Sequence, residues 1–170
     1  DSEYIQFGFN RLAVLDLSDN ANQPIQSPSG RYMMVFNGEI YNHLELRDSL
    51  SDYESFFKGN GDTESLIACF DYYGISTTVK KLNGMFAIGI FDNRDKKLYL
   101  IRDFAGIKPL HYGWNGKKLV FASQYNQISR HPDFINETVD EKVLKLYLTQ
   151  HYIPSPFGLL KNTYSVNPGE

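Results

Sequence analysis

The sequence predicts an α+β protein built mainly on antiparallel sheet. Two observations lead to this fold class. Short apolar segments recur along the chain, and turn sequences such as Asn93-Arg94-Asp95 and Asn115-Gly116 join them as in β-hairpins. Between these segments lie stretches whose apolar residues follow helical spacing. With 170 residues, 12 Tyr and 12 Phe, the chain is long enough to bury a core.

The first half of the chain predicts two strands and two helices. The strands are 11–17 and 31–36, and the helices are 42–50 and 62–73. Asn37-Gly38 follows the second strand directly and predicts a tight turn there. Asn42 is the expected N-cap of the first helix, with Glu45 three residues on, and Gly74 is the expected stop of the second.

The second half predicts two hairpins and then two helices. The strands are 85–92, 96–102, 109–114 and 117–122, and the helices are 123–130 and 140–149. Segment 85–92 is apolar at nearly every position, which is typical of a strand covered on both faces. Thr138 is the expected cap of the last helix.

The tail 153–170 holds three prolines and reads as a linker or the edge of a following domain. We therefore expect one domain over 1–137. Residues 138–170 would connect it to a second domain and begin that domain.

Composition and charge exclude several classes of function. The formal net charge is −3, so no basic surface is predicted for nucleic acid or an anionic membrane. No segment is apolar for long enough to span a bilayer, and the first ten residues do not resemble a signal peptide. Cys69 is the only cysteine, which excludes an internal disulfide and a multi-cysteine zinc site. The four histidines are scattered, so we expect no metal site, and a reducing, cytoplasmic setting fits best.

Three positions have both a structural and a chemical interpretation. Asn37-Gly38 is a turn or, through the Asn amide and an unhindered Gly N–H, a holder of a developing oxyanion. Arg11 is a solvated residue at a strand end or a bidentate clamp on a carboxylate. Asp62 is a helix cap or an exposed carboxylate that receives an ammonium group. Cys69, beside Phe70 in a helix, is expected to be a packed core thiol.

Longer strings settle what single residues leave open. They are 11–17 RLAVLDL, 36–47 FNGEIYNHLELR, 61–66 GDTESL, 82–87 LNGMFA, 102–112 RDFAGIKPLHY and 121–123 FAS. In this order they resemble the N-terminal glutaminase domain of the glutamine-hydrolysing asparagine synthetases, which are class II glutamine amidotransferases. Segment 139–170 resembles the stretch that joins this domain to the ATP-using synthetase domain, so the resemblance covers nearly the whole chain.

The resemblance implies a fold, a reaction and a set of roles. The expected fold is a four-layer αββα sandwich of two stacked, mainly antiparallel sheets, as in N-terminal-nucleophile hydrolases. An N-terminal cysteine attacks the glutamine side-chain amide, a thioester forms as ammonia leaves, and water releases glutamate. Transferred to this sequence, Asn37 and the Gly38 N–H form the oxyanion hole. Arg11 holds the substrate α-carboxylate and Asp62 its α-ammonium. The full set of expected substrate-binding residues is Arg11, Val14, Asn37, Glu39, Gly61 and Asp62.

The resemblance also implies partners. L-Glutamine is the expected substrate, and ammonia passes to a C-terminal synthetase domain of the same polypeptide that uses ATP and magnesium. The glutaminase part itself is expected to need no cofactor. No nucleic-acid or membrane partner is expected, and the oligomeric state, a homodimer included, stays open.

The sequence departs from the family pattern at its start. No cysteine stands at the start, where position 1 is Asp. The family pattern expects a Cys-Gly pair some tens of residues before Arg11. Cys69 has no free α-amino group to assist it, so the chain as written is expected to hydrolyse no glutamine. Two alternatives remain: an amidotransferase for a sugar or polysaccharide precursor, and a non-catalytic relative that binds glutamine.

Overall fold

The computed structural model describes residues 5–10 and 22–170. The chain divides into two compact units, Asp1–Tyr99 and Leu100–Glu170. The predicted strand 11–17, which holds Arg11 and Val14, lies outside the described residues. The α+β class and the two antiparallel sheets are confirmed. Within the described ranges, no helix combines the length and the apolar character needed to cross a membrane.

The first unit is organised around a four-stranded sheet with strand order β1-β2-β3-β4. Its strands are β1 (Ile25–Gln26), β2 (Tyr32–Ile40), β3 (Gly84–Asp92) and β4 (Lys97–Arg102), and β4 crosses the boundary between the units. β2 and β3 pair antiparallel over their full length, from Tyr32 opposite Asp92 to Ile40 opposite Gly84. The strand predictions at 85–92 and 96–102 are thus confirmed to within a residue.

The predicted turn at Asn37-Gly38 is wrong. β2 continues through both residues, which pair with Ala87 and Phe86 of β3. A local turn preference is weaker than an unbroken ladder of hydrogen bonds to a long apolar neighbour. The pair therefore lies within a strand of the sheet, which ends at Ile40.

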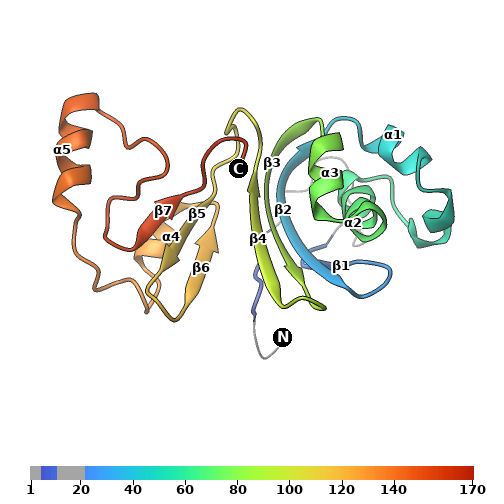
Figure 1. Ribbon diagram of the computed structural model, residues 1–170, viewed down its shortest axis with the longest axis horizontal. Coiled ribbons are helices and arrows are strands. Elements are labelled where there is room, and N and C mark those ends of the chain that lie inside the picture. The colour runs from blue at the N-terminus through green and yellow to red at the C-terminus, as the bar shows by residue number, and fades with distance from the viewer. Residues whose placement is uncertain (1–4, 11–21) are drawn as a thin grey trace. The chain divides into compact units, whose positions relative to one another are not determined.

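Helices cover one face of this sheet (Figure 1). They are α1 (His43–Asp48), the 3₁₀-helix η2 (Ser51–Phe56), α2 (Asp62–Tyr73) and α3 (Ile75–Lys81). α2 supplies much of the core, because Leu66, Ile67 and Phe70 are fully buried, as their helical spacing predicts. α2 ends at Gly74, as expected, with φ at +77°.

The predicted cap of α1 is only half right. Asn42 occupies the N-cap position, but its side chain makes no capping hydrogen bond. It donates to the Lys81 carbonyl at 2.9 Å and accepts from the Asn83 N–H at 3.0 Å instead. These bonds fasten the start of α1 to the connection between α3 and β3.

The second unit holds a three-stranded antiparallel sheet with strand order β6-β5-β7. Its elements are β5 (His111–Trp114), β6 (Leu119–Ala122), α4 (Tyr125–Ser129), α5 (Glu141–Gln150) and β7 (Thr163–Ser165). The predicted hairpin around Asn115-Gly116 is confirmed. β7 lies in the tail 153–170, for which a linker or the edge of a following domain was predicted, and it pairs with β5. The domain boundary expected at 137/138 stays a prediction.

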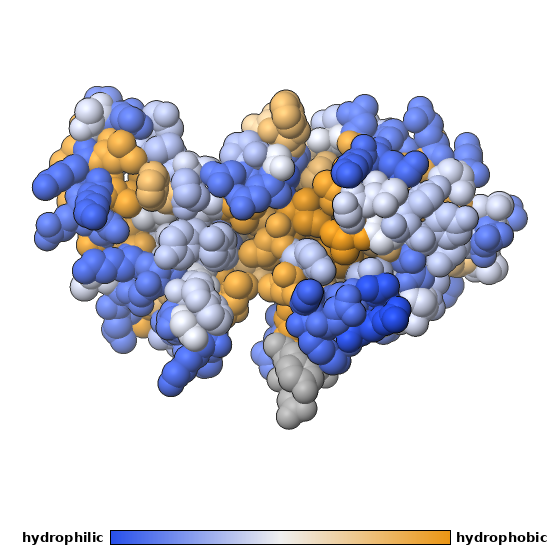
Figure 2. All heavy atoms as spheres, in the orientation of Figure 1, coloured by the Kyte–Doolittle hydropathy of each residue, from blue (hydrophilic) through white to orange (hydrophobic). Residues whose placement is uncertain are grey.

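The cap predicted for α5 is wrong. Asp140, not Thr138, is the N-cap, and its carboxylate accepts from the Lys142 N–H at 2.9 Å and the Val143 N–H at 3.4 Å. The helix leaves Leu144, Tyr147 and Leu148 partly exposed, and Figure 2 shows hydrophobic surface over α5.

Arg102 and Asp103 begin the string 102–112 and anchor the loop that follows β4. The Arg102 guanidinium donates to the Lys108 carbonyl at 2.8 Å and to the Val166 carbonyl at 2.7 Å. Asp103, which is almost fully buried, accepts from the Ile107 N–H at 2.8 Å and the Lys108 N–H at 2.9 Å. Arg102 therefore joins the loop after β4 to the tail within the second unit, and Asp103 holds the loop itself.

Candidate functional site

The site begins on β2, where Asn37, Gly38 and Glu39 occupy consecutive strand positions opposite β3. A strand in a paired sheet is among the more rigid supports that a protein offers a reacting group. The three residues are of intermediate exposure, so they are accessible without being at a mobile loop tip. Their placement keeps both expected oxyanion donors, the Asn37 amide and the Gly38 N–H, on one short stretch of strand.

Two glycines let the backbones approach closely at this point. A Cβ added to Gly38 would overlap the Met85 carbonyl oxygen and would stand 2.7 Å from the Phe86 Cα. A Cβ added to Gly84 would overlap the Glu39 carbonyl oxygen and would stand 3.0 Å from the Ile40 Cα. Each glycine is thus required by the backbone of the opposite strand.

Side chains hold the other edge of β2 on either side of Gly38. The Gln23 amide donates to the Phe36 carbonyl at 3.0 Å and accepts from the Phe36 N–H. Farther along, the Asp62 carboxylate accepts from the Ile40 N–H at 2.9 Å. Because N–H groups alternate in direction along a strand, the N–H of Gly38 faces the same edge as those of Phe36 and Ile40. That direction suits a donor to a ligand that lies along this edge.

Asp62 has an exposed fraction of 6% and is more deeply buried than Glu39, the other ionisable candidate that the structure describes. The prediction of an exposed carboxylate is therefore wrong, although α2 begins at Asp62 as expected. Burial raises the pKa of Asp62, while the Ile40 N–H and the charge of His43 act to lower it and the charge of Glu39 acts to raise it. His43 and Glu39 therefore lie close enough to influence the charge on Asp62.

Gly61 is the N-cap of α2, and a network that the sequence analysis missed holds the loop before it. Arg47 of α1 donates to the Gly59 carbonyl at 2.8 Å and to the Gly61 carbonyl at 3.1 Å. Glu64 accepts from the Lys58 N–H at 3.2 Å and the Gly59 N–H at 2.8 Å. Both residues stand inside the strings FNGEIYNHLELR and GDTESL, which was the available signal.

The structure thus brings together Asn37, Gly38, Glu39, Gly61 and Asp62, through the bond between Asp62 and Ile40. Arg11 and Val14 lie outside the described residues. Cys69 is fully buried on α2, and burial raises its pKa to about 11, which confirms a packed core thiol.

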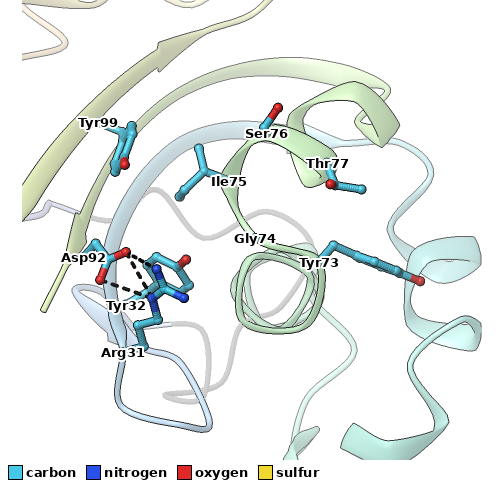
Figure 3. Close-up of a pocket in the computed structure, with 9 residues that line it drawn as sticks. All are labelled: Arg31, Tyr32, Tyr73, Gly74, Ile75, Ser76, Thr77, Asp92 and Tyr99. Atoms are coloured by element: carbon cyan, nitrogen blue, oxygen red, sulfur yellow. Dashed lines mark hydrogen bonds and ion pairs between the residues drawn. The ribbon is translucent and has the colours of Figure 1, made fainter. Parts of the chain in front are cut away.

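A hollow of about 380 Å³ elsewhere in the first unit does not coincide with these residues. Figure 3 shows that Arg31, Tyr32, Asp92 and Tyr99 line it, and Tyr32 is the first residue of β2. The Arg31 Nη2 forms an ion pair with the Asp92 Oδ2 at 2.7 Å, so this cation already has a partner within the protein. Among the described residues, no cluster of three His, Cys, Asp or Glu suits a metal ion.

The sequence is similar to those of glutamine-hydrolysing asparagine synthetases. It is 36% identical over 167 residues to asparagine synthetase [glutamine-hydrolyzing] 1 of Bacillus subtilis, covering 98% of this chain and 26% of the relative. It is 31% identical over 177 residues to putative asparagine synthetase [glutamine-hydrolyzing] 2 of Methanocaldococcus jannaschii, covering 95% of this chain and 34% of the relative. The chain therefore spans between a quarter and a third of the length of these two relatives.

A solved structure shares the fold. The chain resembles the structure of glutamine phosphoribosylpyrophosphate amidotransferase from B. subtilis, with a TM-score of 0.53 and 24% identity over 63% of this chain and 25% of the other. All 170 residues match the family described as a glutamine amidotransferase domain. On this match, and on identities above 30% over nearly its whole length, the chain belongs to the glutamine amidotransferase domain family.

Proposed function

We propose that this domain binds L-glutamine along the edge of β2 that the Gly38 N–H faces and hydrolyses its side-chain amide, releasing ammonia for a synthetase domain of the same polypeptide. The observation that carries the proposal is the position of Asn37 and Gly38. They lie in an internal stretch of strand, between the clamps of Gln23 and Asp62. Such fixed donors act on charge that develops during the reaction, because they need no reorganisation when it appears.

The proposed reaction proceeds through a thioester. A cysteine thiolate attacks the carbon of the glutamine amide, and the carbonyl oxygen becomes an oxyanion held by the Asn37 amide and the Gly38 N–H. The cysteine's own α-amino group accepts the thiol proton and returns it to the leaving nitrogen, so ammonia departs. Water then attacks the thioester, which frees glutamate and restores the thiol.

The nucleophile in this scheme is a cysteine at the mature N-terminus, and these 170 residues do not supply one, since Cys69 is buried within α2. An α-amino group suits this role because its pKa of about 7.7–8.0 lets it accept a proton near neutral pH. We accordingly propose that the chain as written binds glutamine without hydrolysing it.

Two residues are proposed to orient the substrate by binding its α-carboxylate and its α-ammonium group. Arg11 would clamp the α-carboxylate through its planar fork, with Val14 beside it. Asp62 would receive the α-ammonium, with Glu39 and the Gly61 backbone nearby. The Asp62 carboxylate has two oxygens, of which Oδ2 accepts from the Ile40 N–H, so it can bind the strand and the ligand together.

The proposed acceptor of ammonia is the activated carboxylate of aspartate, formed with ATP and magnesium in the synthetase domain. The names of the two relatives, both of them asparagine synthetases, support aspartate over a sugar or polysaccharide precursor. A cytoplasmic location and a homodimer stay predictions.

Asn37→Ala tests the oxyanion role. In an active form of the protein, with the N-terminal cysteine present, kcat for glutamate release should fall by about 10²–10³ with a smaller change in KM, because the donor acts mainly in the transition state. Ala suits the extended backbone that Asn37 adopts in β2, so folding should be retained. Steady-state glutaminase assays measure both constants.

Asn42→Ala is the matched control. Asn42 also bonds main-chain groups, at the start of α1, but it takes no part in the proposed site. It should leave kcat unchanged. If Asn37→Ala folds and turns over glutamine at the wild-type rate, the oxyanion role is wrong. If the unaltered 170-residue chain shows no glutamine binding by calorimetry, the proposed substrate is wrong.

A further inference from the structure

We propose that Arg47 is a positioning residue for the glutamine site: its guanidinium sets the shape of the 57–61 loop and, through it, the place of Gly61 and Asp62. This inference rests on the proposed function, because it presupposes that Gly61 and Asp62 bind glutamine. Arg47 itself is not proposed to touch the substrate. Arg47 acts through its neighbours alone, from its position on α1.

All three guanidinium nitrogens of Arg47 donate hydrogen bonds within the protein. Its Nε donates to the Ser65 Oγ at 3.0 Å, its Nη1 to the Gly59 carbonyl at 2.8 Å and its Nη2 to the Gly61 carbonyl at 3.1 Å. The same group lies over the Phe57 ring, 4.3 Å from its centroid. One cation thus contacts both ends of the 57–61 loop and the first turn of α2.

Glu64, in the first turn of α2, completes the network. Its Oε2 lies 3.7 Å from the Arg47 Nη2, and the two side chains are 6% and 16% exposed. The carboxylate also accepts from the N–H groups of Lys58 and Gly59. The loop therefore offers its carbonyl groups to the cation and its N–H groups to the anion, which leaves few alternative conformations for it.

The loop is coupled to β2 by one bond. Gly61 and Asp62 are consecutive, and the Asp62 carboxylate accepts from the Ile40 N–H at 2.9 Å. A displacement of the loop therefore moves the Asp62 carboxylate relative to Gly38 and Glu39, which precede Ile40 on the same strand. A small displacement of a binding group can weaken substrate binding strongly, because the group must lie at the right distance and angle from the substrate.

Lysine cannot replace Arg47 in this role. Its single ammonium cannot reach Ser65, Gly59 and Gly61 together, because three donors on one nitrogen do not match a planar fork. Arg47→Lys thus keeps the charge while removing the planar fork on which the loop depends. It is the informative substitution.

Hydrogen exchange on the full natural protein tests the positioning itself, without substrate. In Arg47→Lys the N–H groups of Lys58 and Gly59 should exchange at least about tenfold faster, as should that of Ile40. Exchange at Ile88 in β3 should not change, which distinguishes local loosening from a general loss of stability. Unchanged exchange at Lys58, Gly59 and Ile40 would overturn the proposal.

Calorimetry with L-glutamine tests the consequence for binding. Arg47→Lys should raise the dissociation constant about tenfold or more, and in an active form it should raise KM with kcat nearly unchanged, since no transition-state donor is removed. Arg31→Lys is the matched control: its guanidinium lies over the Tyr32 ring and pairs with Asp92 in the same unit, and it should leave glutamine binding within about twofold.

The outcomes separate this proposal from the proposed function. A wild-type protein that binds no glutamine overturns the function and the link between Arg47 and the substrate, while the exchange result still decides whether Arg47 orders the loop. A wild-type protein that binds glutamine, with Arg47→Lys binding it equally well, overturns the positioning role alone. Equal weakening by Arg31→Lys would also overturn it, because the effect would then be one of general stability.

Discussion

Asp62 has its carboxylate almost out of water while one oxygen accepts from the Ile40 N–H. Burial is the dominant influence on this group, and it raises the pKa above the ordinary value of 3.8 despite the hydrogen bond. The proposed role needs the charged form, because only a carboxylate attracts an ammonium group. Structure and function therefore favour opposite protonation states of one side chain.

This opposition predicts two pH dependences from one residue. A folded-state pKa raised above the unfolded value favours the neutral acid, so the stability due to Asp62 is fully present below about 3.8 and is lost as pH rises through the higher folded-state pKa. Relative to Asp62→Asn, the wild type should therefore lose stability as pH rises through this window. Urea denaturation of both proteins across that pH range measures the difference.

Glutamine binding should change in the opposite direction. It should weaken as pH falls through the folded-state pKa, because the carboxylate that receives the ammonium becomes neutral. Asp62→Asn should bind weakly at every pH. Parallel binding curves for wild type and variant would show that Asp62 does not contact the ammonium group.

The sequence proposes which residues form the candidate site, but it mispredicts their structural setting. The residues Asn37, Gly38 and Asp62 follow from distinctive strings, but a turn was expected at the first pair and exposure at the third. Turn preference is a local property, whereas the pairing of β2 with β3 depends on residues some fifty positions apart. Arg47 escaped notice because an arginine on a short helix has no pattern that shows it turning inward.

At the scale of elements, the predicted helices form, but one cap was misplaced and one α-helix was missed. The segments 62–73 and 140–149 do form helices, α2 with the same limits and α5 at Glu141–Gln150. The cap of α5 was misplaced because Thr138 and Asp140 are both good N-cap residues, and only the backbone decides between them. α3 was not predicted, since its Ile75, Thr77, Thr78 and Val79 are weak helix formers. The bond from the Thr78 hydroxyl to the Cys69 carbonyl at 2.8 Å fastens it to α2.

Asp140→Ala should destabilise the second unit by about 0.5–2 kcal/mol, because two N–H groups of the first turn of α5 lose their acceptor. The free energy of unfolding in urea measures the loss. Asp140→Asn is the control, since the Asn oxygen can also cap, and it should cost much less. The prediction fails if Thr138→Ala has the larger effect.

At the scale of the whole molecule, the 170 residues carry one thiol, and it is inaccessible. Cys69 is fully buried, and with a pKa of about 11 only about one molecule in a thousand holds a thiolate at pH 8. The native chain should therefore resist a thiol reagent such as Ellman's reagent and should react fully once unfolded in denaturant. Absorbance at saturating reagent reports both states.

The same labelling experiment can be done on an active form that carries the N-terminal cysteine. Its added thiol should react quickly in the native protein, with loss of glutaminase activity in step. Rapid labelling of Cys69 in the native 170-residue chain would contradict the burial on which its exclusion as nucleophile rests.

Gly38 and Gly84 limit how this sequence can diverge. Each lies where the main chain of the opposite strand passes, near Phe86 for the first and near Ile40 for the second. Every amino acid shares those main-chain atoms, so a smaller neighbour across the strand cannot make room for a new side chain. A change at one glycine therefore has no compensating change at another position, and the two positions do not co-vary. Among descendants of this chain that keep the sheet, both columns of an alignment should stay glycine, each for its own steric reason.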